Sequence, residues 1–408
     1  MMAEFLDNHD AMPIGEGEPK PLNGHDQNAP CVPPVFDAGE DDGPIPPRGW
    51  LQGTTFCRGF ISALTGAGAA GKTAIRYLQY IAQATGRPLA SDHVHARCPV
   101  LIVCLEDGIE EVRRRIRALR LHYSISGEEL KGWLFFWAPS GHKLLETDPR
   151  GQRVSGALEG ELRGLIARHD IGLVSIDPFI KAHGCDENDN NAVDAVCIVL
   201  IKIATDLDCA IDLLQHHRKG ALSPGDADSG RGASALKDAA RLVRTATPMT
   251  EDEAETFGIA DERASLVRLD DAKINLAPRA GAARWFKLVG VPLGNLTAVY
   301  PHGDTIQAAE PWKPPDLWRA SSATFNAILD EIDAGLPGGR PYSDHTAATD
   351  RAAWPIVQKH LADRTEKQCR EIIRTWVRNG VLTIVDYEDE ADRKTRKGLR
   401  LNPAKRPT

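Results

Sequence analysis

Residues 66–73 read GAGAAGKT: a glycine, four arbitrary residues, a second glycine, a lysine and a hydroxyl residue. The apolar run ISALT precedes this loop, and the helical pattern AIRYLQYIAQAT follows it. In that context successive backbone N–H groups turn inward around phosphate oxygens, with the positive end of the helix dipole behind them. The alternative is a tight turn that happens to contain a lysine. The spacing predicts a nucleotide site made of Gly66, Ala67, Gly68, Ala69, Ala70, Gly71, Lys72 and Thr73.

Within this loop we expect Lys72 to reach the β- and γ-phosphates of ATP, and Thr73 to offer its hydroxyl to Mg²⁺. Such a site also needs a carboxylate at the end of a neighbouring buried strand, and IGLVSIDPF supplies Asp177 there. An unpaired Asp after a mostly apolar run would be costly to bury. Either the metal role or a helix cap must therefore account for Asp177.

The run LIVCLED places Glu106 and Asp107 at the end of another strand. In a parallel sheet this end opens onto the same edge as the phosphate loop. Hydrolysis needs a base that orients and deprotonates water, and Glu106 is our candidate. The alternative is that the acidic pair caps the helix beginning near Ile109, a role that suits Asp107 better.

Two histidines, His216 and His217, end the run CAIDLLQHH. Because ligands gather at the carboxyl edge of such a sheet, one imidazole could hydrogen-bond a γ-phosphate oxygen. Two polar residues that simply end a strand are the alternative.

Short apolar runs alternate with helical patterns from Trp50 to about residue 300, which predicts an α/β fold with a parallel sheet. The predicted strands are 60–64, 99–105, 133–137, 171–176 and 209–214, with later ones in LVRLDDAKI and RWFKLV. The predicted helices are 74–84, 110–123, 156–168 and 191–207. Four parts follow along the chain: an acidic tail at 1–48, the α/β domain at 49–300, a Pro-rich linker at 301–320 and a small domain at 321–408.

The formal net charge of -8 belongs to the tail. Residues 1–48 hold ten Asp and Glu against two basic residues, whereas the rest of the chain holds 47 of each. The tail lacks apolar periodicity, so we expect it to be disordered. The eight cysteines are scattered without a C-x-x-C pair, which indicates neither a zinc site nor a disulfide framework. With no signal-like start and no apolar run of about 18 residues, we expect a cytoplasmic protein without a membrane partner.

Several blocks together resemble the RepA family, the hexameric replicative helicases of plasmids, which belong to the RecA-like ATPases. These blocks are the phosphate loop, LIVCLED with EEVRRRIRAL, IDPF, LDCAIDLLQHHRKG, SGRGASALKDAARLV, MTEDEAETFGIADER, DDAKINLAP and RWFKL, and they cover about residues 47–290. The resemblance implies that Lys72 and Thr73 bind Mg-ATP, that Glu106 is the catalytic base and that Asp177 is the carboxylate on the metal side.

The resemblance also implies two roles that the residues alone do not indicate. His217 becomes the γ-phosphate sensor, and Arg241 becomes an arginine finger that enters the neighbouring subunit's site. A finger in trans implies a homo-oligomeric ring, usually of six. Rings of this family pass single-stranded DNA through a central channel, so loops 183–190 and 218–234 are candidates for lining it. Phosphate contacts would come from Arg218, Lys219 and Arg231, although plain surface loops are the alternative.

Two further basic stretches allow two interpretations each. VRRRIRALR at 112–120 is either a nucleic-acid patch or the solvated face of a helix with Val112, Ile116 and Leu119 inward. TEKQCREIIRTWVRNG predicts a helix from the N-cap Thr365 to Gly380, with Lys367, Arg370, Arg374 and Arg378 on one side. Two helical segments near 322–334 and 347–361 and a later hairpin resemble a winged helix, which binds either duplex DNA or protein.

These observations predict a Mg²⁺-dependent ATPase motor, either a ring-forming DNA helicase or a replication ATPase of a plasmid, phage or other mobile element. The first alternative is a loading or regulatory factor that binds DNA under nucleotide control without unwinding it. The second is a scaffold protein that binds nucleotide without turnover.

Overall fold

The computed structural model describes residues 37–39, 41–148, 150, 152–184, 189–216, 224–225, 233–316, 319–389 and 393–407. By internal contacts the chain divides into Met1–Pro47 and Arg48–Thr408, and the elements described below all belong to the second unit. The tail predicted to be disordered lies largely outside the described residues.

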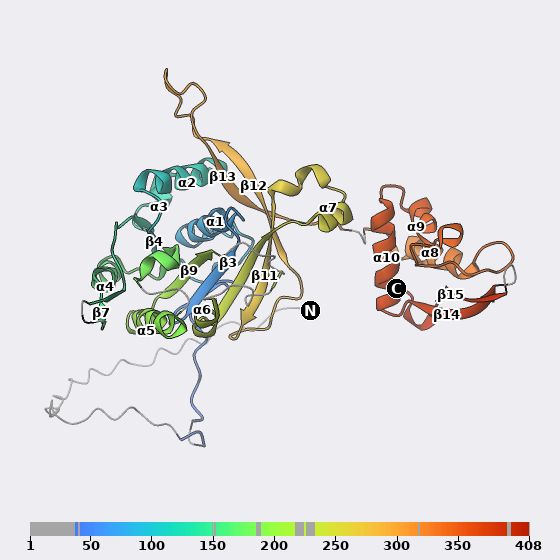
Figure 1. Ribbon diagram of the computed structural model, residues 1–408, viewed down its shortest axis with the longest axis horizontal. Coiled ribbons are helices and arrows are strands. Elements are labelled where there is room, and N and C mark those ends of the chain that lie inside the picture. Colours follow the sequence, from blue (N-terminus) through green and yellow to red (C-terminus); the bar gives the residue numbers. More distant parts are fainter. Residues whose placement is uncertain are drawn as a thin grey trace, which may run out of the picture. The chain divides into compact units, whose positions relative to one another are not determined.

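A nine-stranded sheet forms the centre of the α/β region (Figure 1). Its strand order is β13-β12-β11-β10-β3-β9-β8-β4-β5, in which β10 to β5 run parallel and β11 to β13 are antiparallel additions. This mostly parallel sheet confirms the predicted α/β class. The strands are β3 (Ile61–Gly66), β4 (Val100–Cys104), β5 (Leu134–Trp137), β8 (Leu173–Asp177), β9 (Ala210–His216), β10 (Leu242–Pro248), β11 (Leu266–Ile274), β12 (Arg284–Pro292) and β13 (Thr305–Trp312).

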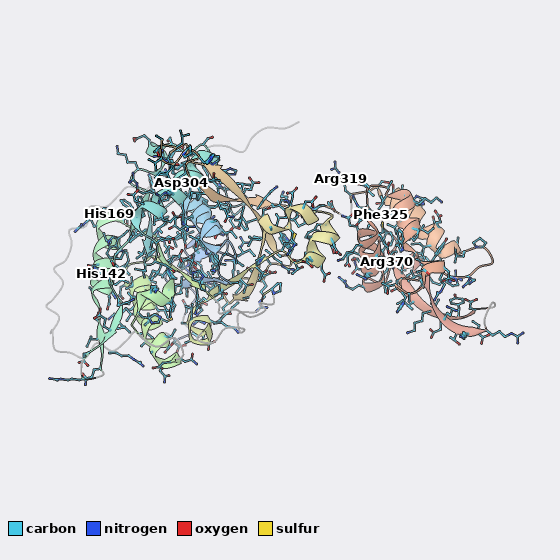
Figure 2. All side chains as sticks on the ribbon, turned by 45° about the horizontal axis from the view of Figure 1, so that its top comes forward. His142, His169, Asp304, Arg319, Phe325 and Arg370 are labelled. Atoms are coloured by element: carbon cyan, nitrogen blue, oxygen red, sulfur yellow. The ribbon has the colours of Figure 1, made fainter. Side chains whose placement is uncertain are left out.

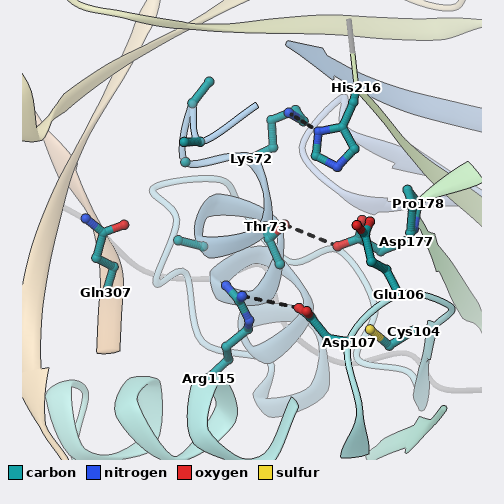
Figure 3. Close-up of a pocket in the computed structure, with 14 residues that line it drawn as sticks. Lys72, Thr73, Cys104, Glu106, Asp107, Arg115, Asp177, Pro178, His216 and Gln307 are labelled. Atoms are coloured by element: carbon teal, nitrogen blue, oxygen red, sulfur yellow. Dashed lines mark hydrogen bonds and ion pairs between the residues drawn. The ribbon is translucent and has the colours of Figure 1, made fainter. Parts of the chain in front are cut away.

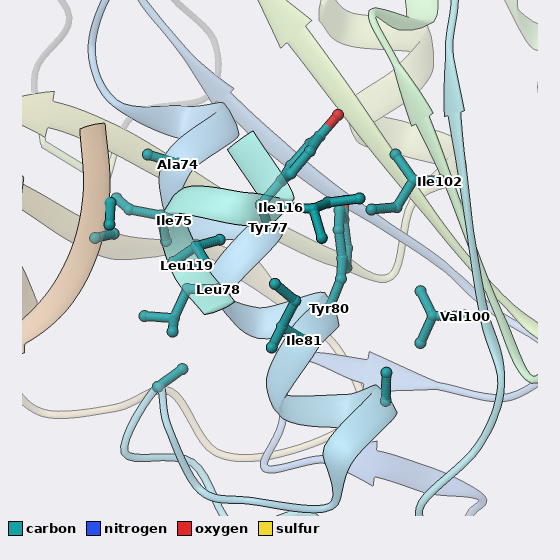
Figure 4. Packing of buried hydrophobic residues seen from close by; sticks show 14 of the residues in the cluster. Ala74, Ile75, Tyr77, Leu78, Tyr80, Ile81, Val100, Ile102, Ile116 and Leu119 are labelled. Carbon is teal, nitrogen blue, oxygen red and sulfur yellow. The ribbon is translucent and has the colours of Figure 1, made fainter. Parts of the chain in front are cut away.

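Helices cover both faces of the sheet and enclose two separate hydrophobic cores. On one face lie α1 (Lys72–Thr85), α2 (Ile109–His122) and α3 (Gly127–Leu130), and on the other α4 (Ala157–His169), α5 (Asn190–Asp206) and α6 (Ala233–Ala239). Figure 4 shows the first core, where α1 and α2 pack over β4 through buried side chains such as Ile81, Leu119 and Ile102. Each such side chain contributes about 1.5–3 kcal/mol when fully buried.

Shorter elements complete this part of the chain. They are the pairs β1 (Trp50–Gln52) with β2 (Phe56–Cys57) and β6 (Leu145–Thr147) with β7 (Arg153–Ser155), the helix α7 (Glu251–Phe257), and the 3-10 helices η1 (Phe179–Ala182) and η2 (Ala260–Ser265).

The stretch predicted to be a Pro-rich linker contains the edge strand of the sheet instead. β13 pairs with β12 along its whole length and buries Ala308 and Ala309 completely. Pro311 is tolerated because an edge strand does not need every backbone N–H for pairing. The Tyr123 hydroxyl donates to the Ala309 carbonyl at 2.8 Å and fixes the strand to the end of α2. The linker interpretation is therefore wrong for Thr305–Trp312, because proline content alone does not show whether a strand lies at an edge.

A buried polar network ties α1 to three strands beneath the GAGAAGKT loop. The Asp212 carboxylate on β9 forms an ion pair with Arg76 at 3.0 Å and accepts hydrogen bonds from Tyr80 at 2.6 Å and Ser62 at 2.7 Å. Ser175 on β8 donates to the Tyr80 hydroxyl at 2.7 Å. Because these side chains are all buried, the network fixes α1 relative to β3, β8 and β9.

Residues 321–407 form a smaller unit with its own hydrophobic core. It contains α8 (Ser322–Ala334), η3 (Thr349–Arg351), α9 (Trp354–His360), α10 (Glu366–Arg378), the hairpin β14 (Leu382–Asp389) with β15 (Lys394–Leu401), and η4 (Pro403–Lys405). The expected helices and hairpin are thus present, and Thr365 caps α10 through a capping box with Gln368. Phe325, labelled in Figure 2, packs edge-on against Trp376 with ring centroids 5.8 Å apart.

The buried network leads to a stability prediction. Substitution Asp212→Ala leaves the Arg76 guanidinium buried without its carboxylate, which costs about 3–5 kcal/mol when one partner of a buried pair is removed. We expect the free energy of unfolding to fall by that amount in urea titrations. The control is Asp194→Ala on the exposed side of α5, with an expected change within about 0.5 kcal/mol. Equal effects of the two substitutions would contradict the prediction.

Candidate nucleotide site

The GAGAAGKT loop connects β3 to α1 and is closed around the Lys72 side chain. The Lys72 ammonium donates to the Gly66 carbonyl at 2.9 Å, to the Ala67 carbonyl at 2.7 Å and to His216 Nδ1 at 3.1 Å (Figure 3). Gly71 precedes the first residue of α1 with φ of 78°, a left-handed conformation that favours glycine. A Cβ atom there would lie 3.0 Å from Leu288 Cδ1, so a larger residue would also push against this side chain.

The ionisation of this lysine follows from its position. Lys72 is almost completely buried, and this burial lowers its pKa to about 8, while the nearby Asp177 carboxylate acts in the opposite direction. Desolvation of its own imidazole, followed by the charge of Lys72, lowers the pKa of His216. His216 is therefore neutral at pH 7, which leaves Nδ1 free to accept the lysine's hydrogen bond.

Asp177 ends β8 directly beside the start of α1. Its Oδ2 accepts a hydrogen bond from the Thr73 hydroxyl at 3.2 Å, and a cis peptide bond joins it to Pro178. Burial raises the pKa of Asp177 to about 6, although the Thr73 hydrogen bond and Lys72 both lower it. Asp177 caps no helix, since the 3-10 helix that follows starts after Pro178. Of the two explanations for this carboxylate, its position beside Thr73 favours the metal role.

The residues just described border one cavity of about 300 Å³. Figure 3 shows the loop in its centre, with the ends of β8 and β4 on one side and β13 on the other. The lining residues are Ala69, Ala70, Gly71, Lys72, Thr73, Ala74, Cys104, Glu106, Asp107, Arg115, Asp177, Pro178, His216 and Gln307. Of the predicted loop residues, Gly66 and Ala67 serve instead as carbonyl acceptors for Lys72, and Gly68 does not line the cavity.

Glu106 and Asp107 follow β4 and have different environments. Glu106 is exposed and faces the cavity close to Asp177 (Figure 3). Asp107 instead accepts a hydrogen bond from Arg115 at 3.2 Å. The cap of α2 is Gly108, without a side-chain hydrogen bond, so neither carboxylate caps this helix. This arrangement leaves Glu106 available to act on a ligand in the cavity.

The two histidines at the end of β9 differ in what the structure describes. His216 lines the cavity and contacts Lys72, whereas His217, the residue implied by the family resemblance, lies outside the described residues. The alternation of side chains along a strand could have indicated His216. His216 lies four residues after Asp212 on β9, so both side chains lie on the same face of the sheet. The Asp212 side chain contacts α1 on that face.

Arg241 is exposed and does not line this cavity. It directly precedes β10, in which Leu242 pairs with Ser62 and Ala246 with Gly66. Five strand residues thus separate Arg241 from the level of the loop, a distance of about 16 Å along the sheet. A role for Arg241 in catalysis would therefore have to be exerted on another copy of the chain.

The remaining predicted contacts are only partly described. Arg218, Lys219 and Arg231 lie outside the described residues, as do residues 185–188 of the first loop. On α2, Val112, Ile116 and Leu119 are buried and Arg113 pairs with Glu110 at 2.9 Å, as expected for a solvated helix face.

Sequence reasoning missed two long polar side chains that line the cavity, those of Arg115 and Gln307. Arg115 was counted with the solvated face of α2, yet it reaches into the cavity and pairs with Asp107 and Glu111, each at 3.2 Å. Gln307 fell in the predicted linker and is brought to the cavity by β13. The neighbouring sequence does not indicate a site role for either residue. Both reach the cavity only because the tertiary fold places α2 and β13 next to the phosphate loop.

The residues present fit Mg²⁺ bound together with a nucleotide. Mg²⁺ prefers oxygen ligands and keeps several waters and phosphate oxygens in its coordination shell, so one or two protein groups suffice. Thr73 and Asp177 supply a hydroxyl and a carboxylate 3.2 Å apart, with the Glu106 carboxylate in the same cavity. Among the described residues, no group of three or more His, Cys, Asp or Glu forms a self-sufficient metal site.

In the part of the chain that the structure describes, no helix has the length and apolarity needed to span a membrane.

The comparison with known families agrees with the geometry of the cavity. Residues 27–221 match the family model of an AAA domain, a stretch that includes the phosphate loop, Glu106, Asp177 and His216. The match ends before β10, so the antiparallel part of the sheet lies outside it. This part of the chain is thus similar to an AAA domain, and the similarity suggests a nucleotide-binding ATPase.

Proposed function

We propose that this protein is a Mg²⁺-dependent ATPase that works as a ring-forming motor on DNA, in the manner of the RepA-like helicases. The observation that carries the ATPase part is one cavity holding Lys72, Thr73, Asp177 and Glu106. These residues supply a phosphate cradle, a hydroxyl–carboxylate pair for the metal and a carboxylate free of helix capping.

The proposed roles follow from the chemistry of each group. Lys72 leaves the loop carbonyls and binds the β- and γ-phosphates, and Thr73 and Asp177 hold Mg²⁺, which when bound neutralises charge on the phosphate oxygens. Glu106 accepts a proton from water as the water oxygen bonds to the γ-phosphorus. The bond from that phosphorus to the bridging oxygen breaks, and ADP leaves with the electron pair. His216 hydrogen-bonds to Lys72 and reports the lysine's movement to β9.

The ring rests on the position of Arg241. Its side chain is exposed at the far end of β10 from its own cavity, so it can complete only a neighbour's site. An arginine finger supplied in trans accelerates phosphoryl transfer by neutralising charge in the transition state. Contacts of this head-to-tail kind close into rings when the rotation permits, and six subunits is the number that we propose.

The DNA partner is proposed from the basic residues and from the family resemblance. Arg374 and Arg378 on α10 are half or more exposed and share Glu371 at 3.5 and 3.6 Å. Arg370 is less available, because it pairs with Glu366 at 2.8 Å and lies over the Trp354 ring. Three helices and a hairpin with such a surface support a winged-helix contact to duplex DNA, while single-stranded DNA passes through the ring.

The second candidate is a loading or regulatory factor that binds DNA under nucleotide control without unwinding it. The arginines of α10 are partly neutralised by Glu366 and Glu371 on the same helix. This favours the second candidate over a protein that binds duplex DNA strongly. Both candidates share the ATPase site and differ in what its turnover drives.

Substitution Glu106→Gln tests the catalytic base. The amide keeps the size of the side chain but cannot take the proton, so we expect kcat to fall roughly 100-fold or more. The affinity for ATP, measured by calorimetry, should stay within about threefold. The matched control is Glu110→Gln, four residues along and outside the cavity. Unchanged turnover in Glu106→Gln would remove this residue from the mechanism.

Mixing two inactive variants tests the shared site. Lys72→Ala removes the cradle and Arg241→Ala removes the finger, so each chain alone should lack ATPase activity. In an equimolar random mixture about a quarter of the interfaces regain both groups, and the rate should recover to about a quarter of wild type. Failure to recover at every ratio would show that Arg241 does not act in trans.

Forked DNA separates the two candidate functions. The helicase predicts ATP-dependent strand displacement, together with an ATPase rate that rises when single-stranded DNA is added. The loading factor predicts DNA binding that changes with nucleotide, without displacement. Native mass measurement with and without ATP would report the ring in the same preparation.

A further inference from the structure

The candidate cavity extends to both sides of the phosphate loop, and only one side is explained by catalysis. In the sheet, the strands that carry Asp177 and Glu106 lie on one side of β3, in the order β9-β8-β4. Gln307 lies on the other side, on β13, beyond β10, β11 and β12. Figure 3 shows these two ends of the cavity, with Lys72 and Thr73 between them.

This arrangement gives a bound nucleotide a direction. The γ-phosphate belongs at the end with Glu106 and Asp177, where the base and the metal ligands are. The phosphate chain runs across the backbone N–H groups at the start of α1. The nucleoside therefore leaves the loop on the opposite side, toward β13.

The β13 side of the cavity is tied to α2 and carries Gln307 among the lining residues. The strand is fixed to α2 by the hydrogen bond from Tyr123 and by the contact of His122 Nε2 with Glu310 at 3.0 Å. The cross-strand neighbour of Gln307 is Gly290, and the Thr305 side chain lies over that glycine. Leu288, on the same strand as Gly290, lies beside Gly71 on this side of the loop.

The Gln307 amide is free to bind a ligand. Its residue is exposed, and within the described part of the chain its side chain has no hydrogen-bond partner. The other long polar side chain nearby, Arg115, is held by Asp107 and Glu111. A primary amide offers donors and an acceptor side by side, a pattern that matches the 6-amino group of adenine and the ring nitrogen beside it. A phosphate, which only accepts, would leave the amide carbonyl unpaired.

We propose that Gln307 recognises the adenine base and makes the site selective for adenine nucleotides. This inference rests on the proposed function, since it assumes that a nucleotide occupies the cavity. The adenine 6-amino group donates to the Gln307 carbonyl, and the amide nitrogen donates to the adjacent ring nitrogen.

The test pairs one ligand change with one side-chain change. ADP is compared with purine riboside 5′-diphosphate, which lacks only the 6-amino group, by calorimetry with Mg²⁺ on the full chain. Wild type should bind ADP roughly fivefold or more tightly than the analogue. This ratio corresponds to about 1 kcal/mol, the contribution expected from a hydrogen-bonded amide–adenine pair. In Gln307→Leu the two affinities should differ by less than about twofold, because the amide that senses the amino group is gone.

Two outcomes distinguish failure of the base-recognition inference from failure of the proposed ATPase function. The control Thr305→Ala, exposed on the same strand and outside the cavity, should keep the wild-type ratio. If Gln307→Leu also keeps that ratio while ADP binds, the base recognition is wrong and the ATPase proposal stands. If no variant binds ADP, including wild type, the proposed function itself fails.

Discussion

The buried carboxylate of Asp212 is the constraint on which the candidate site depends. It accepts from Ser62 on β3 and Tyr80 on α1, and it is paired with Arg76 in a region from which water is excluded. An unpaired charge there would be costly, so the four groups fix one another in a single arrangement. The site residues lie at the ends of the same elements: Lys72 is one helical turn before Arg76, Asp177 is two residues after Ser175, and His216 is four residues after Asp212. The hydrogen bonds from Lys72 to His216 at 3.1 Å and from Thr73 to Asp177 at 3.2 Å are a consequence.

The antiparallel half of the sheet has a part in the site as well. Val267 on β11 and Leu288 on β12 pack against Gly71, so the loop has a wall on the side away from Asp177. This wall adds a close contact to the left-handed backbone that already favours glycine at this position. It also lies beyond the residues that match the AAA domain model, so the part of the cavity that would meet the nucleoside is set by strands outside that match.

In the proposed mechanism, the hydrogen bonds of Lys72 link nucleotide binding to β9. Lys72 is held by two loop carbonyls and by a neutral His216, and a triphosphate would compete for the same ammonium. Movement of the lysine would release His216 at the end of β9, just before the residues that the sequence places in a candidate DNA-contacting loop. The coupling between nucleotide and DNA in the proposed motor has a physical starting point in that one hydrogen bond.

The sequence by itself determined the phosphate loop, Asp177, Glu106 and most of the parallel strands. These features are local: a loop between an apolar run and a helix, and a carboxylate at the end of a buried strand, need only neighbours along the chain. The tertiary structure decided the rest. Gln307 and Arg115 reach the cavity because β13 pairs with β12 and packs on α2, contacts between segments far apart in sequence. No local pattern distinguishes a proline-containing edge strand from a linker, because the difference lies in the partner strand and not in the residues themselves.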